Sequence, residues 1–474
     1  MSKLVKNTVI YTVGNVLTAI SAFLLLPLYT KFMSVADFGI TNSMQTVTGI
    51  LIIIITLALD RSLGRLYYDY TDEKGRRDFL GTIFFSLLSF GIIGTVICFL
   101  SKDLLNRLFP DIPFHPYFTY SILYTFILLI INYSQMIAQV KQNSKQFMFI
   151  SLSSVIITAL CNIVIVAKLG EGALGFVKGT LIGSLIMIPI VLYYIHKSIN
   201  YTFNFSILKM ALIFSLPVLP SLLSSWILNL SDRVFIDNYF TKADVGIYSL
   251  GYKLASLITY ISGALFMAYN PLFFEIANRE NMSTEEKKEK LYKINSGVIL
   301  IIGLIGLCIL SGSDIILKLF FKKEYLTSYH YISIFALSFI ISQIGSLFNQ
   351  MIYQNKKTQH VAAIIIICAG INIGLNYSLI PNFGVYFAAI DSLICNIIFF
   401  IAMYFLARKN FFIKTDWKIL GIILTAYIII YLENQFLLSK ELIISIPVKL
   451  VTILLMLWIF KNPILGIIKT IKNK

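Results

Sequence analysis

The chain has 474 residues, of which 58% are hydrophobic and 13% are charged, and its mean hydropathy is +0.82. A soluble domain carries about 25% charged residues, so this composition excludes a soluble globular protein and is typical of a membrane-embedded one. The formal net charge of +16 then indicates cytoplasmic loops held against an anionic leaflet rather than a nucleic-acid-binding surface.

Apolar segments long enough to cross a bilayer recur along the whole chain. A membrane-spanning helix needs about 20 apolar residues, which predicts an all-α integral membrane protein with about 14 transmembrane helices. The expected spans are residues 8–30, 40–60, 80–100, 117–139, 147–167, 174–195, 207–230, 246–270, 295–311, 329–352, 361–380, 386–407, 417–432 and 442–460. The basic N-terminus leads directly into the first span, so we expect a retained helix rather than a signal peptide.

Lysine and arginine are distributed unevenly among the connecting segments. With a cytoplasmic N-terminus, the inside segments hold about twice as many of them as the outside segments, which predicts that both termini are cytoplasmic. The segment with Lys318, Lys322 and Lys323 is the exception, because it falls outside. Every connection is short. The segment 271–294 has mixed charge and is expected to form a surface helix.

A motif near the N-terminus recurs near the middle of the chain. Residues 32–40 (FMSVADFGI) resemble residues 239–247 (YFTKADVGI). In both copies a hydroxyl residue precedes an aspartate by three positions, which is the spacing of a helix capping box. The glycine two residues after that aspartate, Gly39 or Gly246, allows close approach of a neighbouring helix. We interpret Asp37 and Asp244 as structural.

Further matches follow in the same order along both halves. Asn162 in the fifth span corresponds to Asn372 in the eleventh, and the Gln142-Asn143 pair corresponds to Gln354-Asn355. Spans 1–6 and 7–12 are therefore predicted to be parallel six-helix repeats related by an axis along the membrane normal. The corresponding division is an N-terminal lobe at 1–200, a C-terminal lobe at 201–410, and two extra helices with a basic cytoplasmic tail at 411–474.

Polar residues follow one face of several spans. In the eighth span, Ser249, Lys253, Ser256 and Tyr260 recur at helical spacing. Similar stripes occur at Thr41, Gln45 and Thr48; at Asn132, Gln135, Gln139 and Gln142; at Ser225, Asn229 and Asp232; and at Ser342, Ser346, Asn349 and Tyr353. Interhelical hydrogen bonding explains any one stripe. Five stripes together favour a shared hydrophilic path.

Charged residues within spans are costly and therefore informative. Lys253 lies on the stripe of the eighth span, although its depth also allows snorkelling to the interface. Arg233 ends the seventh span and either caps it or pairs with Asp232. Arg61 at the end of the second span is either a positive-inside anchor or a cavity residue. Asp391 in the twelfth span is a candidate coupling-ion site or a partner for a lumen cation.

Motifs of enzyme chemistry do not occur in the sequence. It contains no phosphate-binding Walker loop, no GxSxG and no HExxH. The five cysteines form no CxxC pair, so neither a disulfide framework nor a zinc site is supported. We therefore expect no enzymatic activity, no catalytic residues, no metal and no cofactor.

The motifs together resemble those of the multidrug/oligosaccharidyl-lipid/polysaccharide exporter superfamily, in particular its polysaccharide branch of Wzx-type flippases. The resemblance rests on Gly14-Asn15, the run Pro27–Ser34, Asp37-Phe38-Gly39, Asp232-Arg233, the run Asp244–Tyr248 with Tyr252-Lys253, and the run Ile380–Val385. It covers essentially the whole chain, including the helix count. After the last motif the family usually has Gly-Ala-Ala, whereas this chain has Tyr386-Phe387-Ala388-Ala389.

The resemblance implies two lobes around a central cationic cavity. It also implies translocation of undecaprenyl-diphosphate-linked oligosaccharide across the cytoplasmic (inner) membrane of a bacterium, for O-antigen or capsule synthesis. The matching cationic positions are Arg61, Arg233, Lys253 and Lys31. The polar lumen residues, taken from the stripes, are Gln45, Asn229, Ser249, Ser256, Gln135 and Asn349. Expected partners are the lipid-linked oligosaccharide, membrane lipids and polymerase or chain-length proteins of the same pathway, without nucleic acid.

Other functions remain open. A drug or organic-cation antiporter of the same fold would need acidic residues in its spans, where Asp391 is the clearest example. A membrane polymerase or glycosyltransferase of the same pathway would need a large outer loop, which the short connections do not provide. A lipid II or sporulation-type flippase of the same superfamily also remains open.

Overall fold

The computed structural model describes residues 21, 23–438, 440–441, 443–455 and 460. These residues are almost entirely helical and contain no β-strand. They fall into two compact units, Met1–Gly246 and Ile247–Lys474. The prediction of an all-α membrane protein is confirmed. The expected lobe boundaries at residues 200 and 410 were drawn from the sequence repeat, and they stay a prediction. The two compact units are defined by packing instead, and residues 201–246 belong to the first of them.

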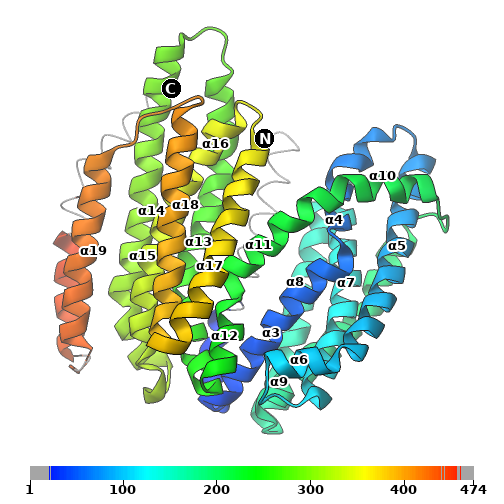
Figure 1. Ribbon diagram of the computed structural model, residues 1–474, viewed down its shortest axis with the longest axis horizontal. Helices are drawn as coiled ribbons and strands as arrows, with labels where there is room; N and C mark the ends of the chain where they lie inside the picture. The colour runs from blue at the N-terminus through cyan, green and yellow to red at the C-terminus, as the bar shows by residue number, and fades with distance from the viewer. Residues whose placement is uncertain (1–20, 22, 439, 442, 456–459, 461–474) are drawn as a thin grey trace. The chain divides into compact units, whose positions relative to one another are not determined.

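The first unit is a bundle that contains six membrane-length helical segments (Figure 1). Its elements are α2 (Leu26–Phe32), α3 (Val35–Thr56), α4 (Leu59–Leu66), α5 (Glu73–Leu100), α6 (Lys102–Leu108), α7 (Thr119–Val140), α8 (Ser144–Ile163), α9 (Gly172–His196), α10 (Phe205–Ser215), α11 (Leu219–Leu230) and α12 (Asp232–Tyr239). The helices α5, α7 and α9 contribute the largest numbers of apolar side chains to its core, including Phe79, Ile83 and Ile122.

The second unit begins within the first turns of α13 (Lys242–Ala277). Its other elements are α14 (Thr284–Phe320), α15 (Ser328–Ser346), α16 (Phe348–Tyr353), α17 (Thr358–Phe383), α18 (Tyr386–Arg408), α19 (Trp417–Leu437) and a shorter apolar helix at Ile443–Leu455. We expected the segment 271–294 to form a separate surface helix. In the structure, residues 284–293 are instead the first turns of α14, which continues directly into the ninth span. A capping box between Ser283 and Glu286 begins this long helix.

Twelve helical segments of the described residues are long and apolar enough to cross a membrane. They correspond to the second to thirteenth predicted spans. Most of the first predicted span, 8–30, lies outside the described residues, and so does the end of the last, 442–460. The seventh predicted span is broken by a 3-10 turn at Leu216–Val218, where Pro217 cannot donate a backbone hydrogen bond. Figure 1 shows α10 and α11 running in different directions on either side of this turn.

The two predicted capping boxes are confirmed. Ser34 and Asp37 bond reciprocally at the start of α3, at 3.0 and 3.2 Å, and Thr241 and Asp244 do the same at the start of α13. The Asp37 carboxylate also accepts from the Ala173 backbone N–H at 3.2 Å, so it joins the first turns of α3 and α9. Both aspartates therefore have the structural role expected of them.

The first turns of α3 and α13 cross at Gly39 and Gly246. A Cβ atom on Gly39 would lie 1.7 Å from the Lys242 carbonyl oxygen, and one on Gly246 would lie 2.3 Å from the Val35 carbonyl oxygen. No side chain fits at either position, because real Cβ atoms do not approach oxygen so closely. Gly39 and Val35 match Gly246 and Lys242 in the two motif copies, so the two close contacts are equivalent to each other.

Candidate functional site

A break between α3 and α4 positions the first charged residues of the site. Leu57 and Ala58 both have left-handed backbone conformations, with φ of 48° and 57°. This conformation costs a residue with a side chain about 1–2 kcal/mol. It ends α3 after Thr56 and restarts the chain as α4, whose first turn carries Asp60 and Arg61. Backbone strain of this kind is often concentrated at functional sites.

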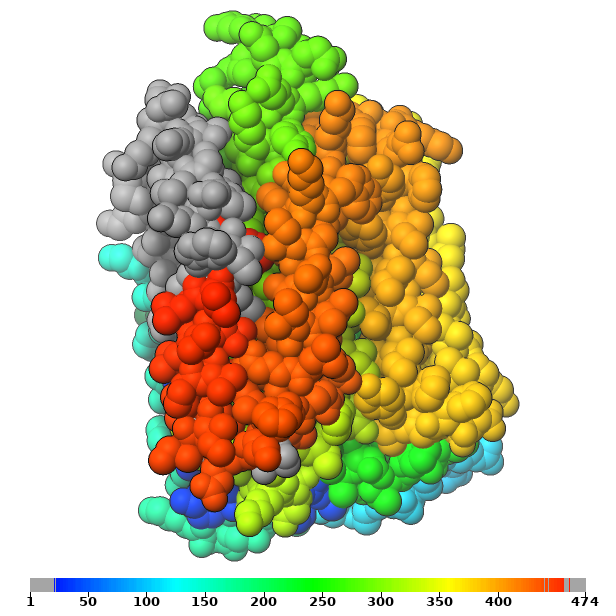
Figure 2. Space-filling view, turned by 90° about the vertical axis from the view of Figure 1, so that its left-hand side faces the viewer, coloured from blue at the N-terminus to red at the C-terminus, as the bar shows by residue number. Residues whose placement is uncertain are grey.

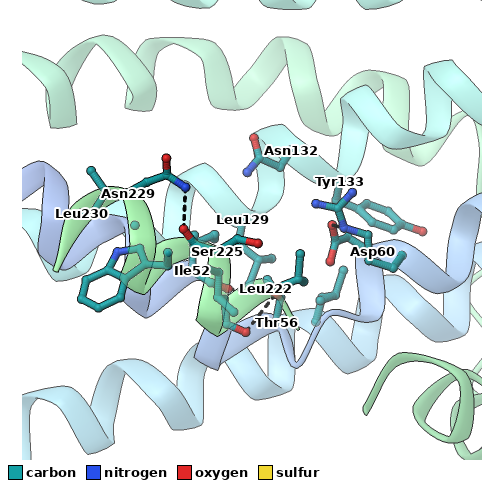
Figure 3. A pocket seen from close by; sticks show the side chains of 15 residues that line it. Ile52, Thr56, Asp60, Leu129, Asn132, Tyr133, Leu222, Ser225, Asn229 and Leu230 are labelled. Atoms are coloured by element: carbon teal, nitrogen blue, oxygen red, sulfur yellow. Dashed lines mark hydrogen bonds and ion pairs between the residues drawn. The ribbon is translucent and has the colours of Figure 1, made fainter. Parts of the chain in front are cut away.

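A cavity of about 450 Å³ lies within the first unit, between α3, α4, α5, α7 and α11. Its polar lining residues come from four of these helices, and apolar residues complete the wall. The lining residues are Gly49, Ile52, Ile53, Thr56, Asp60, Arg61, Leu87, Leu129, Asn132, Tyr133, Leu222, Ser225, Trp226, Asn229 and Leu230. Figure 3 shows Asn132, Asp60 and Asn229 around the same space.

Arg61 supplies the positive charge of this cavity. Its Nε atom lies 3.3 Å from the Asp60 carboxylate, and its side chain is 54% exposed. A guanidinium that is paired once and remains accessible can bind a second anion, because it has five N–H donors. Burial raises the pKa of the Asp60 carboxyl, and the Arg61 charge partly opposes this rise. Asp60 lies beyond the spanning segment Val35–Thr56.

Amide and hydroxyl groups line the other side of the cavity. The Asn229 side-chain amide donates to the Ser225 carbonyl at 2.6 Å, one turn earlier on α11 (Figure 3). Ser225 and Asn229 belong to one predicted polar stripe, and Asn132 on α7 belongs to another. The structure therefore brings parts of two stripes together around one space, which the hydrophilic-path interpretation required.

Trp226 and Tyr133 are cavity residues that sequence reasoning missed. The Trp226 indole N–H donates to the Thr46 carbonyl at 3.2 Å, which fixes α11 against α3. The buried Tyr133 hydroxyl donates to the Leu80 carbonyl of α5. Both look like ordinary core aromatics in an apolar segment. Their positions in the sequence could have indicated a place at the cavity, because each directly follows a residue of a polar stripe: Trp226 follows Ser225, and Tyr133 follows Asn132.

Four other predicted site residues lie in the first unit but do not line this cavity. Arg233 is only 2% exposed, and its guanidinium donates to the Asn229 carbonyl at 2.9 Å. It therefore binds the backbone of a residue that lines the cavity. Lys31 is exposed at the end of α2, and Gln45 is exposed on α3. Gln135 is half-buried on α7. Their assignment to substrate binding stays a prediction.

The remaining predicted polar residues belong to the second unit. On α13, Ser249 is buried and Lys253 is half-buried. The Ser256 hydroxyl donates to the Lys253 carbonyl at 2.8 Å, within its own helix. Asn349 is half-buried on α16. Their role in a lumen likewise stays a prediction.

Asp391 is completely buried between α17 and α18. Its carboxylate accepts from the Asn372 side-chain amide at 2.6 Å and from the Cys395 thiol at 3.4 Å. Asn162, which corresponds to Asn372 in the first half, makes a neutral contact with Thr180 of α9 at 3.2 Å. The corresponding helix pairs are thus joined by asparagines in both halves. A part for Asp391 in ion coupling stays a prediction.

The described residues contain no group of three or more histidine, cysteine, aspartate or glutamate side chains that could hold a metal ion. The chemistry available at the cavity is therefore that of its own side chains. A single guanidinium–carboxylate pair beside amides and hydroxyls can bind a polar anionic head group, but it holds no pair of nucleophile and base.

Comparison with known proteins places this geometry in context. The profile of the polysaccharide biosynthesis protein family matches residues 28–296. A membrane protein of Haemophilus influenzae is 23% identical over 376 residues, which cover 78% of this chain and 89% of the relative.

Solved structures show a similar fold. The lipid II flippase MurJ in an inward closed conformation aligns with a TM-score of 0.71 and 16% identity, over 96% of this chain and 100% of MurJ. An inward-facing multidrug resistance MATE family transporter of the MOP superfamily aligns with a TM-score of 0.58 and 15% identity, over 85% of this chain and 92% of that one. The fold of this chain is therefore similar to the folds of MurJ and of this MATE family transporter.

Proposed function

Because the chain belongs to the polysaccharide biosynthesis protein family, we propose that it is a flippase for undecaprenyl-diphosphate-linked oligosaccharide repeat units. It moves them across the cytoplasmic membrane by alternating access, and they supply surface polysaccharide synthesis such as that of O-antigen or capsule. The fold supports this proposal, since the aligned MurJ structure is that of a lipid II flippase.

The cavity of the first unit is the observation that carries the proposal. Taking a diphosphate out of water without a partner is prohibitive, so a translocating protein must offer it a cation and hydrogen-bond donors. Arg61, Asn132 and Asn229 provide such groups within a wall that is otherwise largely apolar. Its volume of about 450 Å³ lies in the range of small-ligand sites, which suits a diphosphate and the first sugar. The polyprenyl chain remains in the lipid.

The surroundings of the protein follow from the same proposal. It is a multi-pass protein of the bacterial inner membrane with both termini in the cytoplasm, as the loop charges favour. Its partners are the lipid-linked oligosaccharide, membrane lipids, and polymerase or chain-length proteins of the same pathway. These proteins would receive the repeat units on the outer face.

Replacing Arg61 with alanine tests the cavity. We expect R61A to reduce translocation of undecaprenyl-diphosphate-linked oligosaccharide in proteoliposomes by about tenfold or more, because the anionic head group loses its cation. The matched control is R65A, one turn along α4. Arg65 pairs with Asp69, is 61% exposed and does not line the cavity. Equal translocation by R61A and wild type, at equal protein in the vesicles, contradicts the proposal.

The pH dependence of head-group binding should depend on Asp60. Burial raises the pKa of this carboxyl, so it takes up a proton at a pH above the ordinary value of about 4. Once protonated, it no longer repels an anion beside Arg61, and binding of undecaprenyl diphosphate should strengthen as the pH falls.

The D60N variant separates this effect from protonation of the ligand. It should bind undecaprenyl diphosphate more tightly than wild type at neutral pH, and the two should converge in mild acid. Titration of the diphosphate itself affects both proteins equally, so the difference between them reports Asp60. A constant ratio of the two affinities across the pH range contradicts the prediction; binding measured in detergent micelles by thermophoresis is sufficient.

A further inference from the structure

The cavity of the first unit carries charge at one end only. Among its described lining residues, only Asp60 and Arg61 are charged, and both lie in the first turn of α4. The chain reaches this turn directly after α3, whose residues Gly49 and Thr56 also line the cavity. These two residues are seven positions apart, which is about 10 Å along the helix axis at 1.5 Å per residue. The Gly49 end of the cavity is therefore neutral and is separated from the charged end.

Trp226 of α11 lies at the neutral end, against Gly49. A Cβ atom on Gly49 would lie 3.2 Å from the indole Nε1 and 3.3 Å from Cδ1, so this edge of the ring contacts the backbone of α3. On the same edge, the indole N–H donates to the Thr46 carbonyl at 3.2 Å. The ring is thus held in place before any ligand binds, which lowers the entropy cost of binding.

The two aromatic residues of the cavity differ in what they offer a ligand. Tyr133 is only 2% exposed, its ring stacks on Phe84 with centroids 5.4 Å apart, and its hydroxyl donates to the Leu80 carbonyl. Trp226 is half-buried, and the hydrogen bond that fixes it uses one edge of the indole rather than a face. Trp226 is therefore the residue that can present an aromatic face to the cavity.

A sugar ring matches this neutral end chemically. A pyranose has C–H bonds on the face of its ring and hydroxyl groups around its rim. The negative π face of an indole attracts the C–H bonds, and amide side chains both donate to and accept from hydroxyls. Asn132 and Asn229 line the same space, and Figure 3 shows Asn132 between Asn229 and Asp60. An acidic sugar fits poorly, because the lining offers its carboxylate no second cation beyond Arg61.

We propose that Trp226 binds the first sugar of the transported lipid by stacking, and that this sugar is neutral. Arg61 holds the diphosphate at the charged end, and the sugar bonded to it lies against the indole at the neutral end. The distance along α3 between the two ends suits a diphosphate joined to one pyranose ring. Asn132 and Asn229 bind the hydroxyls. This inference rests on the function proposed for the chain and adds the residue that recognises the sugar.

The test compares three lipids that differ only in the group on the diphosphate. They are undecaprenyl diphosphate, undecaprenyl-diphospho-glucose and undecaprenyl-diphospho-glucuronic acid, and their affinities are measured with the full-length protein in nanodiscs. We expect wild type to bind the glucosyl lipid about tenfold more tightly than the lipid without sugar. The glucuronosyl lipid should bind more weakly than the glucosyl lipid. Equal affinity for these two overturns the assignment of a neutral sugar.

Two variants separate stacking from a structural role of Trp226. W226F and W226L both lose the indole N–H bond to the Thr46 carbonyl, but only W226F keeps an aromatic face. The preference for the glucosyl lipid should be largely retained in W226F and lost in W226L. R61A should weaken binding of both lipids while keeping their ratio. A preference that persists in W226L, or that both variants lose equally, overturns the proposal.

Tryptophan fluorescence reports the contact directly. The chain has three tryptophans, so a variant carrying W417F and W458F keeps Trp226 alone. Trp417 is 55% exposed at the start of α19, a helix of the second unit that Figure 2 shows in orange, so its replacement does not alter the cavity. The glucosyl lipid should shift the emission of Trp226 to shorter wavelength than undecaprenyl diphosphate does, because the sugar excludes water from the indole. If W226L does not fold, this shift carries the test by itself.

The outcomes also distinguish this inference from the function on which it rests. Wild type that binds none of the three lipids contradicts the proposed function and this inference together. Wild type that binds undecaprenyl diphosphate and the glucosyl lipid equally, with no difference in Trp226 emission, overturns this inference alone.

Discussion

Alanine at Gly39 is expected to prevent the folded protein from accumulating. The added Cβ atom would lie 1.7 Å from the Lys242 carbonyl oxygen, and this oxygen belongs to the backbone of α13, so no side chain can rotate away. Overpacking of a well-packed interior costs about 1–3 kcal/mol even when side chains adjust. Here the two helices must separate, so we expect a loss of about 3 kcal/mol or more. G246A should have a similar effect, because its Cβ would lie 2.3 Å from the Val35 carbonyl oxygen.

The matched control for both variants is G374A. Gly374 lies inside the membrane-length helix α17, and apart from the backbone of that helix no described atom lies within 4 Å of its Cβ position. Alanine there should be neutral or mildly stabilising, because glycine in a helix costs up to about 1 kcal/mol relative to alanine. The three variants can be compared as fluorescent fusions in detergent. Each is heated, and the fraction of protein that remains monodisperse is measured as a function of temperature. Equal melting of G39A and G374A would show that the α3–α13 crossing relaxes easily.

Removal of the Asn372 side chain is the second change with a large expected effect. Its amide donates to the buried Asp391 carboxylate at 2.6 Å, and a hydrogen bond to a charged group contributes about 1.5–3 kcal/mol. N372A deprives a completely buried carboxyl of this donor and leaves a small void. We expect a loss of about 2–3 kcal/mol in unfolding free energy.

The repeat offers the control for this prediction as well. Asn162 occupies the corresponding position, where its partner is the neutral Thr180 hydroxyl at 3.2 Å. N162A should therefore cost about 1 kcal/mol, the usual contribution of a neutral hydrogen bond. Unfolding in a denaturing detergent, followed by tryptophan fluorescence, measures both variants. If N162A is as destabilising as N372A, the carboxylate of Asp391 does not make the Asn372 contact stronger than the Asn162 contact.

Features that depend on local spacing could be predicted from the sequence. The capping boxes at Ser34 and Thr241 follow from residues three positions apart, and the same motifs indicated the close approach at Gly39 and Gly246. The spans followed from continuous apolar length. Part of the candidate site was also predictable, since Arg61 and Asn229 were named from their charge and stripe positions and both line the cavity.

Features that depend on tertiary contact could not be predicted in the same way. Neither Leu57 nor Ala58 favours a left-handed backbone, so the break that positions Arg61 has no local signal. The long helix α14 looked like a surface helix followed by a short span, because its first turns are charged while hydropathy measures only apolar length. The burial of Arg233 against the Asn229 carbonyl also has no signal in the sequence, and its role as a cavity cation stays a prediction.

The exception to the positive-inside rule has a structural explanation at one residue. Lys318 was counted with an outside connection because it follows a span that seemed to end near residue 311. The helix in fact continues to Phe320, and Lys318 binds the carbonyls of Leu437 and Lys440 at the end of α19. A lysine engaged in this way is a partner within the protein rather than a charge that orients a loop. Counting charges cannot distinguish a lysine bound inside the protein from one in a loop, because the carbonyls that bind Lys318 lie about 120 residues later in the chain.

The crossing at Gly39 and Gly246 also has a consequence for the origin of the chain. Each glycine faces a carbonyl four residues before the other, so one surface patch meets its own copy. This is the form of an isologous contact, in which a homodimer uses the same patch on both subunits. If the two predicted repeats arose by duplication, a six-helix ancestor would have carried this glycine once, and two copies of that ancestor would have met through the same patch on each.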